Sequence, residues 1–426
     1  MLKYIGSPMD EMCSEEIKNI MSTEYGYSED MTKTAYNELY SLYKDEMLFA
    51  ERNYNIEIKN DYPVKALCLH IAHDCNMRCK YCFAEGGDFA QGRKLMTFEV
   101  AKKAIDFIIA KSENRVNLEV DFFGGEPLMG FDVVKKTVEY ARSIEKENNK
   151  NFRFTITTNG ILLNDEIMDY INKEMSNVVL SLDGRKTVND NVRIRVGGSG
   201  SYDAIVPKFK KFVEKRGNGS YYIRGTFTSE NLDFSEDVMH IKDLGFEQVS
   251  VEPVVLNENS PYALKEEHLP KIFDEYEKLA LKLNQIKEKG EFFNFFHFMI
   301  DLEQGPCVIK RVKGCGSGSE YVSVSPEGDI YPCHRFVGKH EFFMGNVLEN
   351  NELNPKIKEM FTASTVLNKP ECDRCWAKYF CSGGCAANNF NSNSDILKPH
   401  KISCELEKKR IECAIMLKAS EAMREE

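Results

Sequence analysis

Hydrophobic and polar positions alternate in two different periods through the middle of this 426-residue chain. Short apolar runs predict six strands, and each is followed by a stretch with helical spacing. The strands are expected over Val64–Ile71, Asn117–Phe123, Phe152–Thr157, Asn177–Leu182, Tyr221–Phe227 and Gln248–Val251. The helices are expected over Thr97–Lys111, Asp132–Glu147, Asp165–Lys173, Tyr202–Lys215 and Phe234–Leu244, with a longer one within Leu264–Lys289. Six successive βα units predict an α/β fold around a parallel sheet.

The two ends of the chain follow other patterns. Before the first strand, helical spacing occurs over Ser14–Met21 and Met31–Leu48, with many charges and no strand. From Gln304 the periodicity stops and the chain is rich in glycine and cysteine, until a short charged helix is expected over Glu405–Glu425. A segment without an apolar core of its own usually depends on metals or disulfides. We expect a helical segment at 1–60, a main domain at 64–290, a cysteine-rich domain at 304–404 and a terminal helix at 405–426.

Composition and charge narrow the class of protein. The net charge is −11, from 56 basic and 67 acidic residues, which argues against nucleic acid as a partner. The N-terminus carries acidic residues where a signal peptide needs an apolar stretch, and eighteen consecutive apolar residues occur nowhere. We therefore expect a cytoplasmic protein with no membrane association. In a reducing compartment its 14 cysteines are available for metals or catalysis.

Three of these cysteines directly follow the first strand. Their spacing is Cys75-x3-Cys79-x2-Cys82. Three thiolates can hold three irons of a [4Fe–4S] cluster and leave the fourth iron open to a substrate or cofactor. The alternative is a tetrahedral zinc site that borrows His73 or Asp74 as its fourth ligand.

This spacing, with the aromatic Tyr81 before the last cysteine, resembles the radical S-adenosylmethionine (SAM) superfamily. Further motifs of that family end the next three strands, at Gly124–Pro127, Thr157–Gly160 and Ser181–Gly184. The resemblance implies a partial (β/α)6 barrel, catalytic cysteines at 75, 79 and 82, and SAM as cofactor. It assigns cofactor contacts to Tyr81 beside the adenine, to Gly124, Gly125 and Glu126 at the amino group, to Asn159, to Ser181 at the polar part, and to Arg193 at the carboxylate. A surface arginine is the alternative for Arg193, because Arg195 lies two residues away.

Seven more cysteines are spaced regularly downstream, too many for one metal. They form Cys315-x12-Gly328-x4-Cys333 and Cys372-x2-Cys375-x5-Cys381-x3-Cys385-x18-Cys404. A pair of structural zinc ribbons is one interpretation. The complete pattern resembles the SPASM extension of radical SAM enzymes, which holds two auxiliary [4Fe–4S] clusters. That resemblance assigns Cys372, Cys375, Cys381 and Cys404 to an outer cluster and Cys315, Cys333 and Cys385 to an inner one.

Two residues beside the inner set remain open to alternatives. Cys307 is a candidate fourth ligand of the inner cluster, and an iron left free for a substrate thiolate is the other possibility. Relatives that oxidise a sulfatase carry an aspartate after the cysteine that matches Cys333, whereas this chain has His334. A histidine can take a proton near neutral pH, so His334 is a catalytic candidate. A buried histidine bonded to a backbone carbonyl is the alternative. Cys68, within the first strand, fits no cluster and is expected in the core.

The substrate is indicated by resemblance alone. Besides the cysteine motifs, Gly197–Tyr202, Arg224–Thr228 and Gly314–Gly318 resemble maturases of the SCIFF (six-cysteine peptide) type, over about Val64 to Cys404. That family implies a cysteine-rich precursor peptide, thioether links from cysteine sulfur to an acceptor carbon, threonine by analogy, and a 5′-deoxyadenosyl radical.

The same resemblance implies a low-potential electron donor such as flavodoxin or ferredoxin. Residues 1–60 resemble the second half of a leader-peptide recognition element, with a generic helical cap as the alternative. Two other functions stay open: a sulfatase-maturase-like side-chain oxidase, and a non-catalytic zinc-ribbon adaptor that binds peptides.

Overall fold

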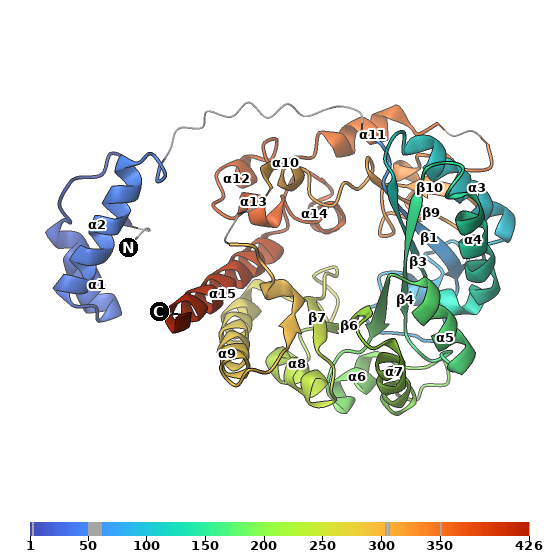
Figure 1. Cartoon of the computed structure of the whole chain (residues 1–426), viewed down its shortest axis with the longest axis horizontal. Helices are drawn as coiled ribbons and strands as arrows, with labels where there is room; N and C mark the ends of the chain where they lie inside the picture. The colour runs from blue at the N-terminus through green and yellow to red at the C-terminus, as the bar shows by residue number, and fades with distance from the viewer. Residues whose placement is uncertain (2–3, 50–61, 303–304, 306, 350–351, 426) are drawn as a thin grey trace. The chain divides into compact units, whose positions relative to one another are not determined.

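The chain divides into two compact units, Met1–Ile58 and Lys59–Glu426 (Figure 1). The structure is a computed structural model and describes residues 1, 4–49, 62–302, 305, 307–349 and 352–425. The expected domain boundaries at residues 60 and 304 lie outside the described residues.

The first unit consists of the two helices that the sequence predicts. α1 spans Glu15–Tyr25 and α2 spans Glu29–Lys44, and a serine side chain caps the N-terminus of each. Their small core contains Ile17, Met21 and Tyr36. The second helix ends four residues before the expected Leu48, because the chain turns at Glu46, whose φ is +57°.

All six expected strands form, and they are neighbours in one sheet in the order of the sequence. They are β1 (Ala66–His73), β3 (Asn117–Gly124), β4 (Asn151–Thr158), β5 (Asn177–Ser181), β6 (Ser220–Phe227) and β7 (Gln248–Pro253). Each pairs in parallel with the next. The short β2 (Lys94–Leu95) pairs with β1, and β8 (Asn294–Phe295) extends the sheet beyond β7. The predicted α/β fold with a partial barrel of parallel strands is confirmed.

Helices cover the outer face of this curved sheet (Figure 1). The expected ones are α3 (Phe98–Lys111), α4 (Phe131–Ile144), α5 (Asp165–Glu174), α7 (Tyr202–Arg216), α8 (Phe234–Asp243) and α9 (Leu269–Glu288). The sequence analysis missed α6 (Lys186–Val192), whose seven residues include only two buried ones, Asn189 and Val192. Single 3₁₀ turns occur at η2 (Glu85–Gly87), η3 (Pro127–Gly130), η4 (Glu266–His268), η5 (Phe296–Phe298) and η6 (His340–Phe342).

The two faces of the strands differ in polarity. Along β3, Leu118, Val120 and Phe122 are fully buried in the main core, and the residues between them belong to the other face. Side chains in a strand point alternately to opposite sides, so one face can be apolar while the other carries polar groups. Toward the carboxyl ends of the strands, this second face carries Thr157, Ser181 and Arg224, which makes it the polar inner wall of the barrel.

The cysteine-rich segment continues the same sheet on the free side of β1. β9 (Tyr321–Val324) pairs in parallel with β1, and β10 (Asp329–Tyr331) and β11 (Gly345–Asn346) follow in antiparallel pairing. Its short helices are α10 (Val308–Arg311), α11 (Pro355–Thr362), α12 (Pro370–Asp373), α13 (Lys378–Cys381) and α14 (Ala386–Asn393). The expectation of a segment without a core is wrong, because Phe336, Phe342 and Phe361 are buried together in a separate cluster.

The terminal helix differs from the prediction in length and start. α15 spans Lys401–Glu425, so Cys404 lies inside its first turn and not before it. The helix packs along α9, where the Arg410 Nε donates a hydrogen bond of 2.9 Å to the Tyr276 hydroxyl. Neither α15 nor any other helix in the described part of the chain is both long and apolar enough to cross a bilayer.

Replacing Phe154 by alanine should destabilise the barrel strongly. Its ring is fully buried on β4, between Phe122 at 5.7 Å and Phe152 at 6.0 Å between ring centroids. Removing such a side chain leaves a cavity, and we expect the free energy of unfolding to fall by about 3–5 kcal/mol. Val196→Ala, at a site that is 61% exposed, should change it by less than about 0.5 kcal/mol. Anaerobic urea denaturation measures both, and equal values for the two variants would contradict this core assignment.

Candidate functional site

The loop that carries Cys75, Cys79 and Cys82 is fixed to the chain after α6. The Arg78 amide donates to the Ile194 carbonyl at 2.7 Å, and the Lys80 amide donates to the Val192 carbonyl at 3.0 Å. These two hydrogen bonds and an isolated antiparallel bridge between Met77 and Arg195 hold the loop against residues 192–195, which positions its three cysteines.

Glycines let the end of β3 approach this loop closely. A Cβ atom on Gly124 would lie 2.3 Å from the Ala72 carbonyl oxygen, and one on Gly125 would lie 2.1 Å from that of Asp74. Gly124 also has a φ of +123°, which side-chain-bearing residues rarely adopt. The Gly125 amide donates to Ala72 at 2.7 Å. The glycine pair is therefore required by packing, independently of any cofactor.

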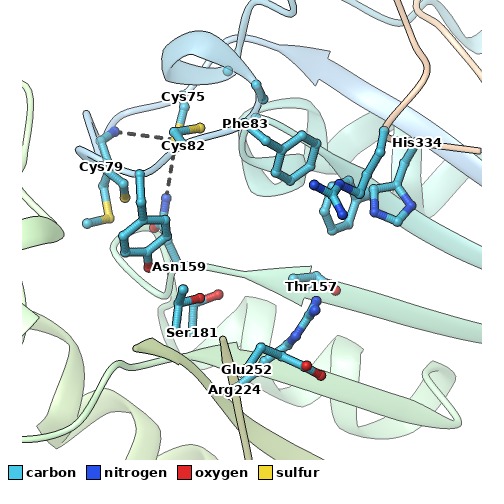
Figure 2. A pocket seen from close by; sticks show the side chains of 18 of the residues that line it. Cys75, Cys79, Cys82, Phe83, Thr157, Asn159, Ser181, Arg224, Glu252 and His334 are labelled. Atoms are coloured by element: carbon cyan, nitrogen blue, oxygen red, sulfur yellow. Dashed lines mark hydrogen bonds between the residues drawn. The ribbon is translucent and has the colours of Figure 1, made fainter. Parts of the chain in front are cut away.

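One cavity of about 440 Å³ lies between this loop and the polar inner wall of the barrel (Figure 2). The structure brings the predicted cofactor contacts together, because all of them line this cavity with the three cysteines: Tyr81, Gly124, Gly125, Glu126, Asn159, Ser181 and Arg193. Asn159 also contacts the cysteine loop, where its side-chain nitrogen Nδ2 lies 3.6 Å from the Cys75 Sγ. The cavity is the candidate active site.

Glu126 is almost fully buried, and its carboxylate connects β3 to the end of β4. It accepts hydrogen bonds from the Thr158 hydroxyl at 2.7 Å, the backbone amide of Asn159 at 2.8 Å and the backbone amide of Leu128 at 3.1 Å. Burial raises the pKa of Glu126 to about 7, although these three donors oppose the shift. Glu126 thus lines the cavity and also connects two strands through its hydrogen bonds.

Arg193 is buried, with 8% of its surface exposed, so it is not the surface arginine of the alternative interpretation. Its Nη1 donates to the Tyr81 hydroxyl at 2.9 Å, and that hydroxyl donates to the Asp183 carboxylate at 2.7 Å. The Arg193 Nε has no partner among the described residues. A buried guanidinium with a free donor at the cavity wall can bind a carboxylate. Sequence analysis missed Asp183, although it stands in the motif Ser181–Gly184.

The three cysteines suit an iron–sulfur cluster better than a zinc ion. Burial raises the pKa of Cys75 to about 12 and that of Cys79 to about 11, so a metal must displace their protons. Within the described residues, no three Cys, His, Asp or Glu side chains converge closely enough for a single ion, whereas a four-iron cube spans wider ligands.

The two extra ligands that a zinc site would borrow differ in how they are engaged. The His73 Nε2 lies 3.1 Å from the Nδ1 of His70, and both rings are fully buried, whereas the His73 Nδ1 has no partner among the described residues. Asp74 Oδ1 accepts from the Cys75 amide at 2.8 Å and lies 3.4 Å from the Arg93 Nε. Asp74 is therefore engaged, and His73 keeps one free ring nitrogen.

His334 also lines the cavity, at the end away from the three cysteines (Figure 2). Its Nδ1 lies 3.0 Å from the Tyr321 hydroxyl, so its partner is a side chain and not the backbone carbonyl of the alternative interpretation. Its ring packs on Phe123, with centroids 4.9 Å apart. Burial, and then the charges of Arg335 and Arg224, lower the pKa of His334 to about 3. The imidazole is neutral at physiological pH.

Four of the seven downstream cysteines, those that the resemblance assigns to an outer cluster, lie together. Cys372, Cys375, Cys381 and Cys404 line a second cavity, of about 1120 Å³. Cys333 is buried, and the charges of Cys385 and Cys315 join burial in raising its pKa to about 12. Cys307 is exposed, and we find no interaction between its thiol and these three among the described residues. Cys68 is buried in β1, as expected.

Two charged residues on the inner wall were not predicted as site residues. Arg224 of β6 and Glu252 of β7 line the cavity across from the three cysteines (Figure 2). Burial raises the pKa of Glu252, but its interactions with His297 and with the charges of Arg410 and Arg224 outweigh burial and lower the value to about 2. The alternating pattern of β6 could have indicated that Arg224 faces the inner wall, because its neighbours Ile223 and Gly225 are buried on the other face.

Comparison with known proteins identifies the main domain. Residues 69–253 match the model of the radical SAM superfamily. This stretch is a radical SAM domain. Such a domain binds SAM and one [4Fe–4S] cluster, and the geometry of the first cavity fits both.

Similarity to individual proteins extends beyond that domain. The cysteine-type anaerobic sulfatase-maturating enzyme of Clostridium novyi is 26% identical over 337 residues, which cover 74% of this chain and 86% of that one. The antilisterial bacteriocin subtilosin biosynthesis protein AlbA of Bacillus subtilis is 23% identical over 347 residues, 78% of this chain and 70% of that one.

A solved structure supports the fold of both halves of the larger unit. The structure of anSMEcpe with bound AdoMet and the Kp18Cys peptide has a TM-score of 0.69 at 19% identity and covers 84% of this chain and all of that one. The match reaches past the radical SAM domain, so the cysteine-rich segment shares the SPASM-type fold. The resemblance to radical SAM peptide maturases that the motifs indicated is confirmed.

Replacing Glu126 by glutamine should flatten the pH dependence of stability. The folded-state pKa of about 7 exceeds the ordinary value of 4.5, so this group stabilises the fold below about pH 4.5 and loses that contribution as the pH rises through 7. A 2.5-unit shift corresponds to about 3 kcal/mol. Glutamine does not titrate, so the difference in unfolding free energy between wild type and variant should change by up to this amount between pH 5 and 7.5. The exposed Glu119→Gln on the same strand is the control, and parallel pH profiles for Glu126→Gln and wild type would contradict the assignment.

Proposed function

We propose that the protein is a radical SAM enzyme that installs thioether links in a cysteine-rich precursor peptide, between a cysteine sulfur and a carbon of an acceptor residue, threonine by family analogy. One observation carries the proposal. Cys385 of the inner set lines the same cavity as Cys75, Cys79 and Cys82. A peptide in this cavity lies between the site of hydrogen removal and a site that can hold a thiolate.

The residues of the first cavity have separable tasks in this proposal. SAM and the cluster held by Cys75, Cys79 and Cys82 supply, when bound, the power to remove a hydrogen atom from an unactivated carbon. Arg193, fixed by Tyr81 and Asp183, holds the carboxylate of SAM through its unpaired Nε donor. The bare backbone of Gly124 and Gly125 leaves room for its amino group. Ser181 and Asn159 line the remaining polar wall.

The residues around Cys385 favour a substrate thiolate. The Arg335 Nη1 lies 3.9 Å from the Cys385 Sγ, and its guanidinium is 5.6 Å from the centre of the Phe83 ring. A positive charge at this place lowers the pKa of an incoming thiol. His334 stands nearby as a neutral imidazole, and its pKa of about 3 makes it a weak base for the thiol proton. Each link removes two hydrogens from the peptide: the acceptor carbon would lose a hydrogen atom to the SAM-derived radical, the thiol would lose a proton, and the remaining electron would pass to the auxiliary clusters.

We assign two auxiliary [4Fe–4S] clusters to the downstream cysteines. The outer site consists of Cys372, Cys375, Cys381 and Cys404, and the inner site consists of Cys315, Cys333 and Cys385. The fourth ligand of the inner site is either Cys307, which is exposed like Cys315 and Cys385, or a substrate thiolate. A low-potential donor such as flavodoxin or ferredoxin completes the system, and residues 1–60 are assigned to leader-peptide binding.

A second candidate function is oxidation of a protein side chain, as in sulfatase maturation. The observation that favours it is the similarity to the sulfatase-maturating enzyme of Clostridium novyi. His334 replaces the aspartate expected of such enzymes, and its pKa of about 3 makes it a weak base. A non-catalytic zinc-ribbon adaptor is disfavoured by the match of residues 69–253 to the radical SAM superfamily.

Coexpression with a cysteine-rich peptide encoded beside the gene tests the proposal. We expect the peptide to lose two hydrogens per link, and the loss should survive reduction and alkylation, because a thioether is not reducible. Mass spectrometry measures both. The triple variant Cys75→Ala, Cys79→Ala, Cys82→Ala should leave the peptide unmodified and form no 5′-deoxyadenosine. An unchanged mass with the SAM-replete wild type would refute the thioether assignment for that peptide, and an oxidised side chain without a cross-link would favour the second candidate.

Arg224→Gln should weaken peptide use without impairing SAM cleavage. Arg224 extends into the cavity from the wall opposite the three cysteines, and no hydrogen bond occupies its side chain among the described contacts. We expect it to bind peptide carbonyl or carboxylate groups, so its loss should raise the KM for peptide about tenfold or more, in line with a lost charged hydrogen bond of about 1.5–3 kcal/mol. Peptide-independent 5′-deoxyadenosine formation should stay unchanged. Arg153→Gln, on β4 outside the cavity, is the matched control, and equal KM values for both variants would exclude the role.

A further inference from the structure

A lysine is buried inside the cysteine-rich segment, and it has no carboxylate partner among the described residues. Lys369 stands just before α12 and is only 2% exposed. Its Nζ donates one hydrogen bond, of 2.9 Å, to the Gly383 carbonyl. Lysine is almost never fully buried unless it is paired with a negative charge. One neutral carbonyl does not meet that requirement for an ammonium with three donors.

The negative charges that can pair with Lys369 are cysteine thiolates of both auxiliary sets. Gly383 lies between Cys381 of the outer set and Cys385 of the inner set. Lys369 and Cys315 also line one small cavity. Burial lowers the pKa of Lys369, and the charges of four thiolates oppose that shift: Cys372, Cys381, Cys385 and Cys315. The ammonium thus lies where the ligand sets of the two sites cross.

Gly383 has the backbone conformation and the small size that this arrangement requires. Its φ is +81°, and a Cβ atom there would lie 3.2 Å from the Lys369 Nζ. A side chain at this position would crowd the ammonium away from the carbonyl. The turn between Cys381 and Cys385 therefore admits the lysine between the two sets.

We propose that Lys369 is the shared counter-charge of the two auxiliary cluster sites, and that it raises the reduction potential of both clusters. The inference rests on the auxiliary clusters assigned under the proposed function. Thiolate ligands leave a cluster negatively charged, and adding an electron increases that charge. A buried cation stabilises the reduced form more than the oxidised form, and net charge is one of the factors that set cluster potentials. In a low-dielectric interior solvent screens this effect little.

A second buried lysine provides the matched control. Lys378 is 8% exposed and donates to the Asp373 carbonyl at 2.8 Å, like Lys369 to Gly383. Its Nζ also lies 3.7 Å from the Asp373 carboxylate, so its charge is already paired. Lys378→Gln removes a buried ammonium from the same segment without removing an unpaired positive charge.

The test compares Lys369→Met, Lys369→Gln, Lys369→Arg and Lys378→Gln in the reconstituted full-length protein. Iron content is counted first, and about twelve irons per chain are expected for three cubes. The potentials then follow from anaerobic redox titration monitored by electron paramagnetic resonance. We expect Lys369→Met and Lys369→Gln to make one-electron reduction of both auxiliary clusters about tenfold less favourable, a shift of about −59 mV. Lys369→Arg and Lys378→Gln should stay close to wild type, and the cluster at Cys75, Cys79 and Cys82 is the internal reference.

Each outcome decides the proposal. Loss of auxiliary iron in both neutral variants but not in Lys369→Arg would support it, since the charge would then be needed to hold the clusters. Unchanged potentials with full iron would overturn it, as would loss of iron in all three Lys369 variants, which indicates a steric role only. An equal shift in Lys378→Gln would also overturn it. Only about four irons in the wild type would refute the auxiliary clusters themselves, and with them this inference.

Discussion

The close contact between the end of β3 and the loop that leaves β1 is the constraint on which the site depends. Gly124 and Gly125 lie against the backbone of Ala72 and Asp74 at distances that no Cβ atom permits. The cysteine loop begins at once after this contact. Its three thiols therefore face the strand ends, where the polar groups of β4 to β7 are available. Without the glycine pair, the loop and the barrel wall would stand too far apart to share one cavity.

A second consequence of the sheet is that it joins the two halves of the larger unit. β9 adds to the free edge of β1 with the same parallel register as the barrel strands. The pairing carries Cys333 and His334, which follow β10, to the rim of the barrel. Cys385 reaches the same cavity from the far side of the cysteine-rich segment. The proposed chemistry at two metal sites on one peptide requires this proximity, and backbone pairing supplies it.

Charge in the interior is arranged around these sites. Arg193 is held by Tyr81 and Asp183, Glu252 lies near the positive charges of Arg410 and Arg224, and Lys369 lies near cysteines of both sets. Buried charges are costly unless they are paired or assigned to a ligand. The positive charges of Arg193 and Lys369 are incompletely paired within the protein. We therefore expect a bound cofactor or cluster to supply the missing negative charge at each. That reasoning connects the proposed SAM contact with the proposed counter-charge.

The sequence predicted the six strands, the helices that follow them and the cysteine motifs, because each is a local pattern of periodicity or spacing, whereas the division of the downstream cysteines into two sets rests on resemblance. It also located the cofactor contacts on the motifs that end β3, β4 and β5. Tertiary structure decided what local patterns do not contain. The start of α15 before Cys404 depends on packing against α9, and the attachment of β9 to β1 is a pairing across about 250 residues. The fold also placed four charged residues beside partners that are distant in sequence: Asp183, Arg224, Glu252 and Lys369. The sequence does not reveal such residues, because a single charged residue gives no local pattern that distinguishes a cavity from solvent.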